Sequence, residues 1–132
     1  MRRGFDTGYF LKYATGELSE THRQVLRDLA REDGLAIANG LVIYELKKLG
    51  SRGVLDMEDA DWLVEIVGNV CEVERVLSNS FLDEAARLSH GNDLSMADAM
   101  MLATARRHDV DELYTTDSDL LAYEGPIEVI LV

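Results

Sequence analysis

Short apolar runs alternate with longer segments of helical periodicity along this sequence, and this alternation constrains the fold more than any other feature. Residues 35–38 form an apolar run that is long enough only for a buried strand, whereas residues 19–32 carry apolar side chains at helical spacing. Strands separated by helices of about 10–15 residues need crossover connections, which produce a mostly parallel sheet. The pattern therefore predicts an α/β fold, and the 132 residues suffice for a single domain over 1–132.

The same pattern predicts where each element lies. The expected strands comprise residues 4–5, 35–38, 70–76, 113–115 and 127–132. The expected helices comprise residues 7–14, 19–32, 41–49, 56–67, 78–88 and 96–107, with a turn of helix at 117–123. Glycine is expected to end two helices, at Gly50 and Gly53 after the third and, in a left-handed conformation, at Gly91 after the fifth. The apolar side chains of the fourth helix that are expected in the core are Met57, Trp62, Leu63, Ile66 and Val67.

Charge and cysteine content limit the classes of function. Acidic residues number 25 against 13 Lys and Arg, so the net charge of -12 gives no long-range attraction for nucleic acid or an anionic membrane. The longest uncharged stretch, residues 34–44, is too short to cross a bilayer, and the first residues lack the apolar segment of a secretory signal. The single cysteine, Cys71, excludes an internal disulfide and a cysteine-based zinc site. We therefore expect a cytoplasmic protein that binds a basic partner or metal cations.

Five acidic residues follow the predicted strands. Asp6 ends the first strand, Glu45 lies in the second turn of the helix after the second strand, Asp98 begins its helix, and Asp117 and Asp119 follow the fourth strand. The carboxyl ends of parallel strands meet at one edge of a sheet, where ligands of open α/β folds bind. Carboxylates brought together there repel each other unless a cation holds them, and Mg²⁺ and Mn²⁺ take oxygen ligands. The joint placement of the acids predicts a metal site.

Each acid also has a purely structural interpretation. Asp6 can cap the helix that follows it, and Asp98 with Ser95 matches a capping box. Glu45 can form a surface ion pair with Lys48, three residues on. The last two acids can form an Asx turn. No single acid decides between these interpretations and a metal site.

Four short motifs resemble those of the PIN-domain family. They are DTGYF from Asp6, IYEL from Ile43, LSMADA from Leu94 with ATA from Ala103, and TTDSDL from Thr115. They resemble the family's D-T/S-x-x-L opening, its second acidic position, its L-S-x-x-D-A and A-T-A pair, and its closing T-x-D-x-D-F/L. The motifs occur in order over nearly the whole chain, and the nearest branch by size is the VapC-like toxin group of prokaryotes. Gly8 departs from the pattern, because serine or asparagine is common there.

The resemblance implies a fold, an activity and a site. The fold is a three-layer α/β/α sandwich with a short, mostly parallel sheet. The activity is that of an endoribonuclease that uses Mg²⁺ or Mn²⁺ to hydrolyse RNA, leaving a 3′-hydroxyl and a 5′-phosphate. The resemblance implies Asp6, Glu45, Asp98 and Asp117 as catalytic residues and metal ligands, with Asp119 as a fifth metal ligand. Bound ions of this kind neutralise the scissile phosphate and lower the pKa of a bound water.

Partners also follow from the resemblance. A VapC-like protein is the toxin of a type II toxin–antitoxin pair, and its antitoxin is expected to insert a basic segment near the cleft acids. Pairing through helices implies a homodimer. The apolar residues available for that contact are Tyr9, Tyr13, Leu41 and Trp62, for which core packing is the alternative.

Residues next to the acids have possible supporting roles. Thr116 and Ser95 can orient a carboxylate or a water. Arg52, Arg106 and Arg107 can bind flanking phosphates, although a solvent-exposed charge is the simpler interpretation of each.

Other classes fit less well. Receiver domains and phosphatases with an aspartyl nucleophile need a late lysine, and no lysine follows Lys48. The histidines His22, His90 and His108 accompany no serine-elbow motif, so Ser/His/Asp catalysis is unsupported. Two alternatives stay open, namely a PIN nuclease for RNA processing outside a toxin system and a non-catalytic PIN-like binding module.

Overall fold

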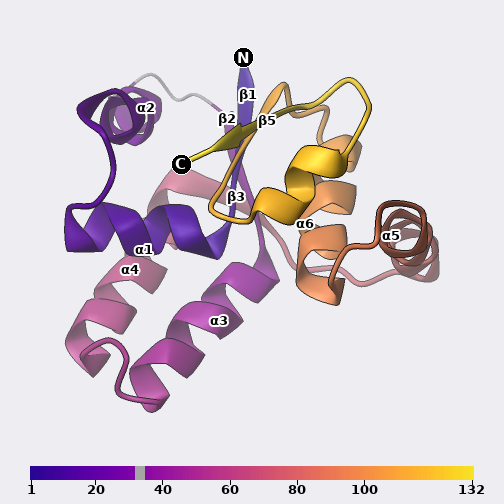
Figure 1. The fold of residues 1–132 in the computed structure, drawn as a ribbon. Coiled ribbons are helices and arrows are strands. Elements are labelled where there is room, and N and C mark those ends of the chain that lie inside the picture. Colours follow the sequence, from indigo (N-terminus) through magenta and orange to yellow (C-terminus); the bar gives the residue numbers. More distant parts are fainter. Residues whose placement is uncertain (32–34) are drawn as a thin grey trace.

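A five-stranded parallel sheet forms the centre of the molecule (Figure 1). The computed structural model describes residues 1–31 and 35–132. The strands are β1 (Arg2–Phe5), β2 (Leu35–Asn39), β3 (Cys71–Glu74), β4 (Glu112–Thr115) and β5 (Glu128–Leu131). The helices are α1 (Thr7–Thr15), α2 (Glu20–Arg31), α3 (Gly40–Ser51), α4 (Met57–Val70), α5 (Asn79–Asn92) and α6 (Met96–Arg107), with a 3-10 turn η1 (Ser118–Ala122).

The order of the strands creates a crevice at the middle of the sheet. The strands lie in the order β3-β2-β1-β4-β5, so the chain first builds outward from β1 on one side and then crosses over to build on the other. Gly4 in β1 is accordingly paired with Ile37 of β2 and with Leu113 of β4. The connections that follow β1 and β4 leave the sheet in opposite directions, and open α/β folds bind ligands at such a switch point.

Helices cover both faces of the sheet. In Figure 1, α1, α2 and α4 lie on one side of the strands and α5 and α6 on the other. Two separate groups of buried side chains fill these layers, one built around Phe5, Tyr9 and Leu63 and the other around Phe81 and Leu102. The predicted three-layer α/β/α sandwich is therefore confirmed.

Side chains of the central strands alternate between the two cores. Ala36 and Ala38 of β2 face the core with Phe5, while Ile37 between them faces the core with Phe81. All three are at most 1% exposed. Strands that are buried on both faces carry uninterrupted apolar runs, which is why the run at 35–38 predicts a central strand.

Several predicted boundaries were wrong. The third strand is shorter than the predicted 70–76, because α4 continues through Val70 and pairing with β2 ends at Glu74. The fifth helix runs past Gly91, and Asp93 instead adopts the left-handed conformation, with φ of 52° and its N–H donating to Ser89. Of the two glycines expected to end the third helix, Gly53 lies just beyond the C-cap Arg52 with φ of 74°, but Gly50 does not end the helix. It lies inside α3, where a Cβ would come 2.8 Å from Ala60 on α4. The predicted end of the second helix at Glu32 lies outside the described residues.

Burial also corrects the sequence-based assignments. Leu63 and Val67 are buried as predicted, but Met57 and Trp62 of α4 are 62% and 48% exposed. Tyr9, expected as a possible dimer contact, is fully buried, and its hydroxyl donates to the His22 carbonyl. Within residues 1–31 and 35–132, no helix has the length and apolar character needed to cross a membrane.

Candidate active site

The four acids of the predicted tetrad line one cleft at the carboxyl edge of the sheet. The cleft has a volume of about 160 Å³, and Asp6, Glu45, Asp98 and Asp117 all contribute to its wall. They come from the end of β1, from α3, from the first turn of α6 and from the segment after β4. Asp119 is not among the lining residues. Its side chain is exposed, and its backbone N–H donates to the Asp117 carboxylate at 2.9 Å.

Asp6 is fixed by three groups of the fold. Its backbone N–H donates to the Tyr114 carbonyl at 3.1 Å, which ties it to β4. One carboxylate oxygen accepts from the N–H of Tyr9 at 3.2 Å and so caps α1, while the other accepts from the Thr115 hydroxyl. Burial raises the pKa of the Asp6 carboxyl, and these hydrogen bonds oppose the rise. The capping interpretation is correct, and it leaves the carboxylate on the wall of the cleft.

Glu45 is held from α1 and not from its own helix. Its Oε1 accepts from the Thr7 hydroxyl at 3.0 Å. The ion pair with Lys48 considered above does not form among the described residues, and the Lys48 ammonium lies 5.9 Å from the centre of the Tyr44 ring. The residue after Asp6 thus orients the second acid.

Asp98 and Asp117 act on each other as a pair. Burial, followed by the nearby Asp117 carboxyl, raises the pKa of Asp98 to about 7, whereas the hydrogen bond from Asp98 lowers the pKa of Asp117. Of the two carboxyls, Asp98 therefore keeps its proton to higher pH, and Asp117 is the one that ionises first. The backbone N–H of Asp98 donates to the Ser95 hydroxyl at 3.3 Å, so Ser95 caps α6 as predicted.

Two residues that organise the cleft were given no role from the sequence, although Thr115 is the first residue of the TTDSDL motif. Thr115 is fully buried, donates to Asp6 and accepts from the Asp117 N–H at 2.9 Å, so one hydroxyl joins two acids. Asn39 is 2% exposed, caps α3 by accepting from Leu41, and donates to the Thr104 hydroxyl at 2.9 Å. This last bond ties the end of β2 to the helix that carries Asp98. The sequence signal that could have indicated these contacts is a polar residue directly after an apolar run, as at Asn39, or within one, as at Thr104.

Gly8 and Thr116 occupy each other's space. A Cβ at Gly8 would lie 1.9 Å from the Thr116 Oγ1 and 2.8 Å from its Cβ. Since real Cβ atoms do not approach this closely, any larger residue at position 8 requires Thr116 to move. Gly8 lacks the serine or asparagine side chain that is common at this position in the family. The Thr116 side chain fills the space that such a side chain would occupy.

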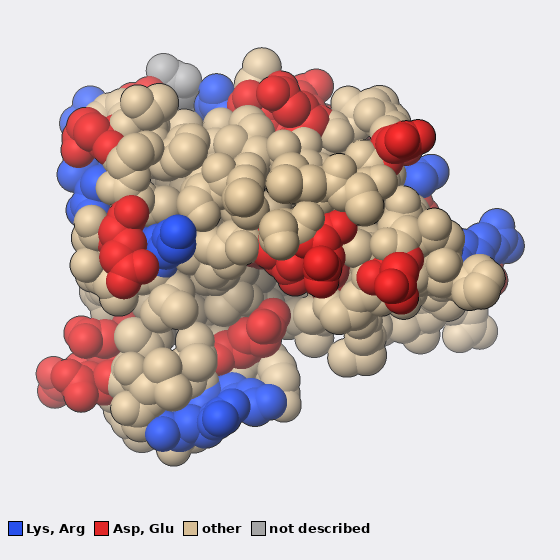
Figure 2. Space-filling model, in the orientation of Figure 1, with Lys and Arg blue, Asp and Glu red and all other residues tan. Residues whose placement is uncertain are grey.

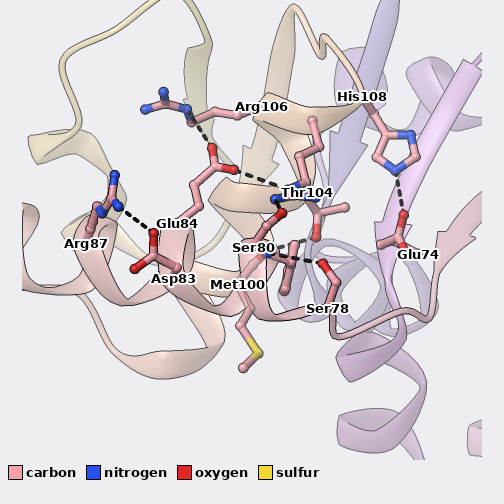
Figure 3. Close-up of polar contacts among 12 residues, drawn as sticks. Glu74, Ser78, Ser80, Asp83, Glu84, Arg87, Met100, Thr104, Arg106 and His108 are labelled. Carbon is pink, nitrogen blue, oxygen red and sulfur yellow. Dashed lines mark hydrogen bonds and ion pairs between the residues drawn. The ribbon is translucent and has the colours of Figure 1, made fainter.

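The predicted phosphate-binding arginines separate into two groups. Arg106 and Arg107 lie in the last turn of α6, opposite the end that carries Asp98, and both form ion pairs with Glu84 at 3.2 Å. Figure 3 shows the pair of Arg106 with Glu84. Eight residues of helix place Arg106 about 12 Å along the axis from Asp98. Arg52, in contrast, lines a groove that adjoins the cleft.

The donor set of the cleft fits a divalent cation. The Asp98 Oδ2 is buried, and among the described residues it has no hydrogen-bond partner. A buried, unsatisfied carboxylate oxygen in a cleft lined by three further acids is suited to a hard cation with oxygen ligands. Within the described ranges, no three acidic, histidine or cysteine side chains already converge closely enough to hold an ion.

Comparisons with known proteins bear on the family and the fold. Residues 5–126 match the family described as PIN domain. No curated protein sequence matches the chain. The structure is similar to VapBC2 from Rickettsia felis bound to a DNA fragment from their promoter, with TM-score 0.75, 13% identity, and coverage of 100% of this chain and 99% of that chain.

Two further solved structures have the same fold. A toxin-antitoxin complex from Klebsiella pneumoniae matches with TM-score 0.65 and 17% identity over 96% of this chain and 98% of that chain. Mycobacterium tuberculosis VapC20, a sarcin-ricin loop cleaving toxin, matches with TM-score 0.65 and 21% identity over 91% of this chain and 93% of that chain. At these identities the similarity concerns the fold.

Proposed function

This chain belongs to the PIN domain family, and we propose that it is an endoribonuclease dependent on Mg²⁺ or Mn²⁺. The observation that carries the proposal is that Asp6, Glu45, Asp98 and Asp117, from four separate elements, line one cleft. PIN nucleases generally use divalent metal ions. We assign these four acids as catalytic residues and metal ligands. Asp119 stays a proposed fifth metal ligand, although it is not among the residues that line the cleft.

The residues of the chain prepare the cleft for this chemistry. When bound, the metal neutralises the scissile phosphate and lowers the pKa of a water that attacks phosphorus. Asp117 is ionised because its pKa is lowered, and Thr115 fixes its position relative to Asp6. Asp98 can hold or release a proton near neutral pH, since its pKa is about 7. Hydrolysis of the RNA phosphodiester bond by this route leaves a 3′-hydroxyl and a 5′-phosphate.

A toxin role is the more specific part of the proposal. Structures of similar fold include a VapBC complex and a toxin-antitoxin complex. We propose a cytoplasmic toxin whose antitoxin inserts an arginine or lysine beside Asp6, Asp98 and Asp117. An RNA-processing nuclease and a non-catalytic binding module are the alternatives. An adjacent gene for a small DNA-binding protein would favour the toxin role.

We also propose a homodimer. Trp62 and Met57 on α4 are exposed apolar side chains, and Tyr13 and Leu41 are partly buried, whereas the burial of Tyr9 removes it from the candidates. Light scattering at tens of micromolar should give about twice the chain mass of 14.8 kDa. A mass equal to one chain at that concentration contradicts this assignment.

Cleavage of RNA in the presence and absence of metal tests the enzymatic proposal. The purified protein should cut a structured RNA with Mn²⁺ or Mg²⁺ and lose this activity in chelator. Asp98→Asn should slow cleavage at least about a hundredfold. Asp61→Asn, at an exposed position of α4 outside the cleft lining, removes the same charge and should cut at the wild-type rate. Equal activity in chelator and in metal would contradict the proposal.

A further inference from the structure

A second groove opens directly from the acidic cleft. It has a volume of about 290 Å³ and shares four lining residues with the cleft, including Thr7 and Glu45. Its far wall is formed by Tyr44, Lys48 and Arg52 of α3 and its C-cap. The cleft and the groove therefore adjoin along these shared residues.

The three residues of that wall form one line along α3. They are four residues apart, so they lie on one helix face at steps of about 6 Å along the axis. All three are exposed, and Tyr44 has 59% of its surface accessible. The ring of Tyr44 and the two cationic groups are thus presented together to solvent.

No carboxylate forms an ion pair with Lys48 or Arg52 in the described part of the chain, whereas five of the thirteen Lys and Arg residues are paired in this way. In the same part of the chain, the five arginines that form ion pairs are Arg3, Arg27, Arg87, Arg106 and Arg107. The face drawn in Figure 2 shows Lys and Arg gathered at the lower end of the molecule, over the region that α3 occupies in Figure 1, with carboxylates beside them.

The negative charge of the rest of the molecule makes these two cations important for binding a polyanion. A chain of net charge -12 repels a polyanion at long range, and the four cleft carboxylates repel phosphate at short range. A nucleic-acid strand can approach the cleft only where cations are concentrated next to it. The groove supplies two cations, an aromatic face and an apolar floor that includes Leu49 and Met96. Phosphate-binding cations combined with an aromatic stacking surface are the features by which proteins hold single-stranded nucleic acid.

We propose that this groove binds the single-stranded RNA segment that flanks the scissile phosphate. Lys48 and Arg52 contact phosphate oxygens, and Tyr44 stacks against a base. The inference rests on the proposed nuclease function and adds to it the path that the substrate takes. The residues bind substrate and take no part in bond cleavage.

Binding of a short fluorescent single-stranded RNA by the Asp98→Asn protein in chelator separates this step from cleavage. Lys48→Gln and Arg52→Gln should each weaken binding about two- to fivefold. Each should also reduce the slope of log K against log salt by about 0.7. Tyr44→Ala should weaken binding at least about fivefold, and Tyr44→Phe should restore most of that loss. Lys47→Gln is the matched control, because Lys47 is an exposed neighbour on α3 outside the groove lining.

Cleavage kinetics of the same substitutions in the otherwise unchanged protein distinguish the two proposals. With metal present, we expect KM to rise in the Lys48, Arg52 and Tyr44 variants while kcat is retained. If the wild-type protein cleaves RNA and these variants bind and cleave as the Lys47 control does, the groove assignment is wrong and the nuclease stands. If binding weakens as expected but no metal condition gives cleavage, the groove stands and the nuclease proposal fails. Unaltered RNA binding together with loss of self-association or of an antitoxin peptide would assign the groove to a protein and overturn the inference.

Discussion

Replacing Asp98 by asparagine should stabilise the metal-free protein, and the effect should depend on pH. Asp98 faces Asp117, and its Oδ2 is buried without a partner among the described residues. Asparagine keeps the size of the side chain, removes its charge and offers an N–H to the Asp117 carboxylate. The substitution therefore removes the cost of ionising Asp98, the cleft carboxyl whose pKa is raised most clearly by both burial and a neighbouring carboxyl.

The magnitude follows from the pKa of Asp98. A difference of one in pKa corresponds to about 1.4 kcal/mol, so a rise from 3.8 to about 7 corresponds to about 4 kcal/mol without screening. Because Asp98 is only half-buried, solvent screening reduces this to about 1–2 kcal/mol. Below pH 4 the carboxyl is protonated in both the folded and the unfolded chain, and the penalty is absent. Between pH 4 and 7 only the folded state keeps the proton, so stability falls as the pH rises, and above pH 7 the penalty is complete.

Urea denaturation in chelator over pH 4 to 8 measures this difference. Wild type should lose about 1–2 kcal/mol of unfolding free energy relative to Asp98→Asn across the range, and the two should converge at pH 4. Asp61→Asn, exposed on α4, serves as the control for general charge effects and should follow the wild-type curve. Parallel curves for wild type and Asp98→Asn would refute the idea that Asp98 is strained by its carboxylate neighbours.

Two further substitutions test the packing and the charge of the cleft. Gly8→Ala should lower the free energy of unfolding by about 1–3 kcal/mol, because the new Cβ displaces Thr116, and the loss should shrink when the same change is made in a Thr116→Gly background. A double-mutant cycle by chemical denaturation gives both values, and equal losses in the two backgrounds would show that the contact is not the cause. Asp6→Asn should melt no lower than wild type in chelator, since burial raises the pKa of Asp6, but should lose most of the stabilisation that Mn²⁺ gives. Thermal unfolding with and without Mn²⁺ measures this, and an unchanged gain would remove Asp6 from the ligands.

The parts of the fold that sequence predicted well depend on local signals. The bounds of α6 were predicted correctly, because Ser95 provides a cap and Arg107 is the last residue before the irregular segment ahead of β4. Parallel pairing followed from the spacing of the apolar runs. The common cleft of the four tetrad acids followed from the positions of Asp6, Glu45 and Asp117 after strands and of Asp98 at the start of its helix. These signals require only neighbouring residues and general rules about parallel sheets.

The parts that were missed depend on contacts between distant residues. Asn39 and Thr104 are 65 positions apart, and nothing near either residue indicates the other. The fit of Gly8 against Thr116 likewise exists only once α1 lies beside the segment after β4. Gly91 is an error of the other kind, in which a local signal was given too much weight. Glycine is favoured at a left-handed helix end but is tolerated within a helix, so its presence did not fix where α5 stops.

Locating bound manganese in crystals tests the central claim most directly. Crystals grown with Mn²⁺ should give an anomalous difference peak inside the cleft, within about 2.3 Å of carboxylate oxygens from at least two of Asp6, Glu45, Asp98 and Asp117. Asp98→Asn crystals grown in the same way should give a weaker peak or none. A cleft without anomalous density at saturating Mn²⁺, or a peak bound only by residues elsewhere on the surface, would contradict a metal-dependent active site at this edge of the sheet.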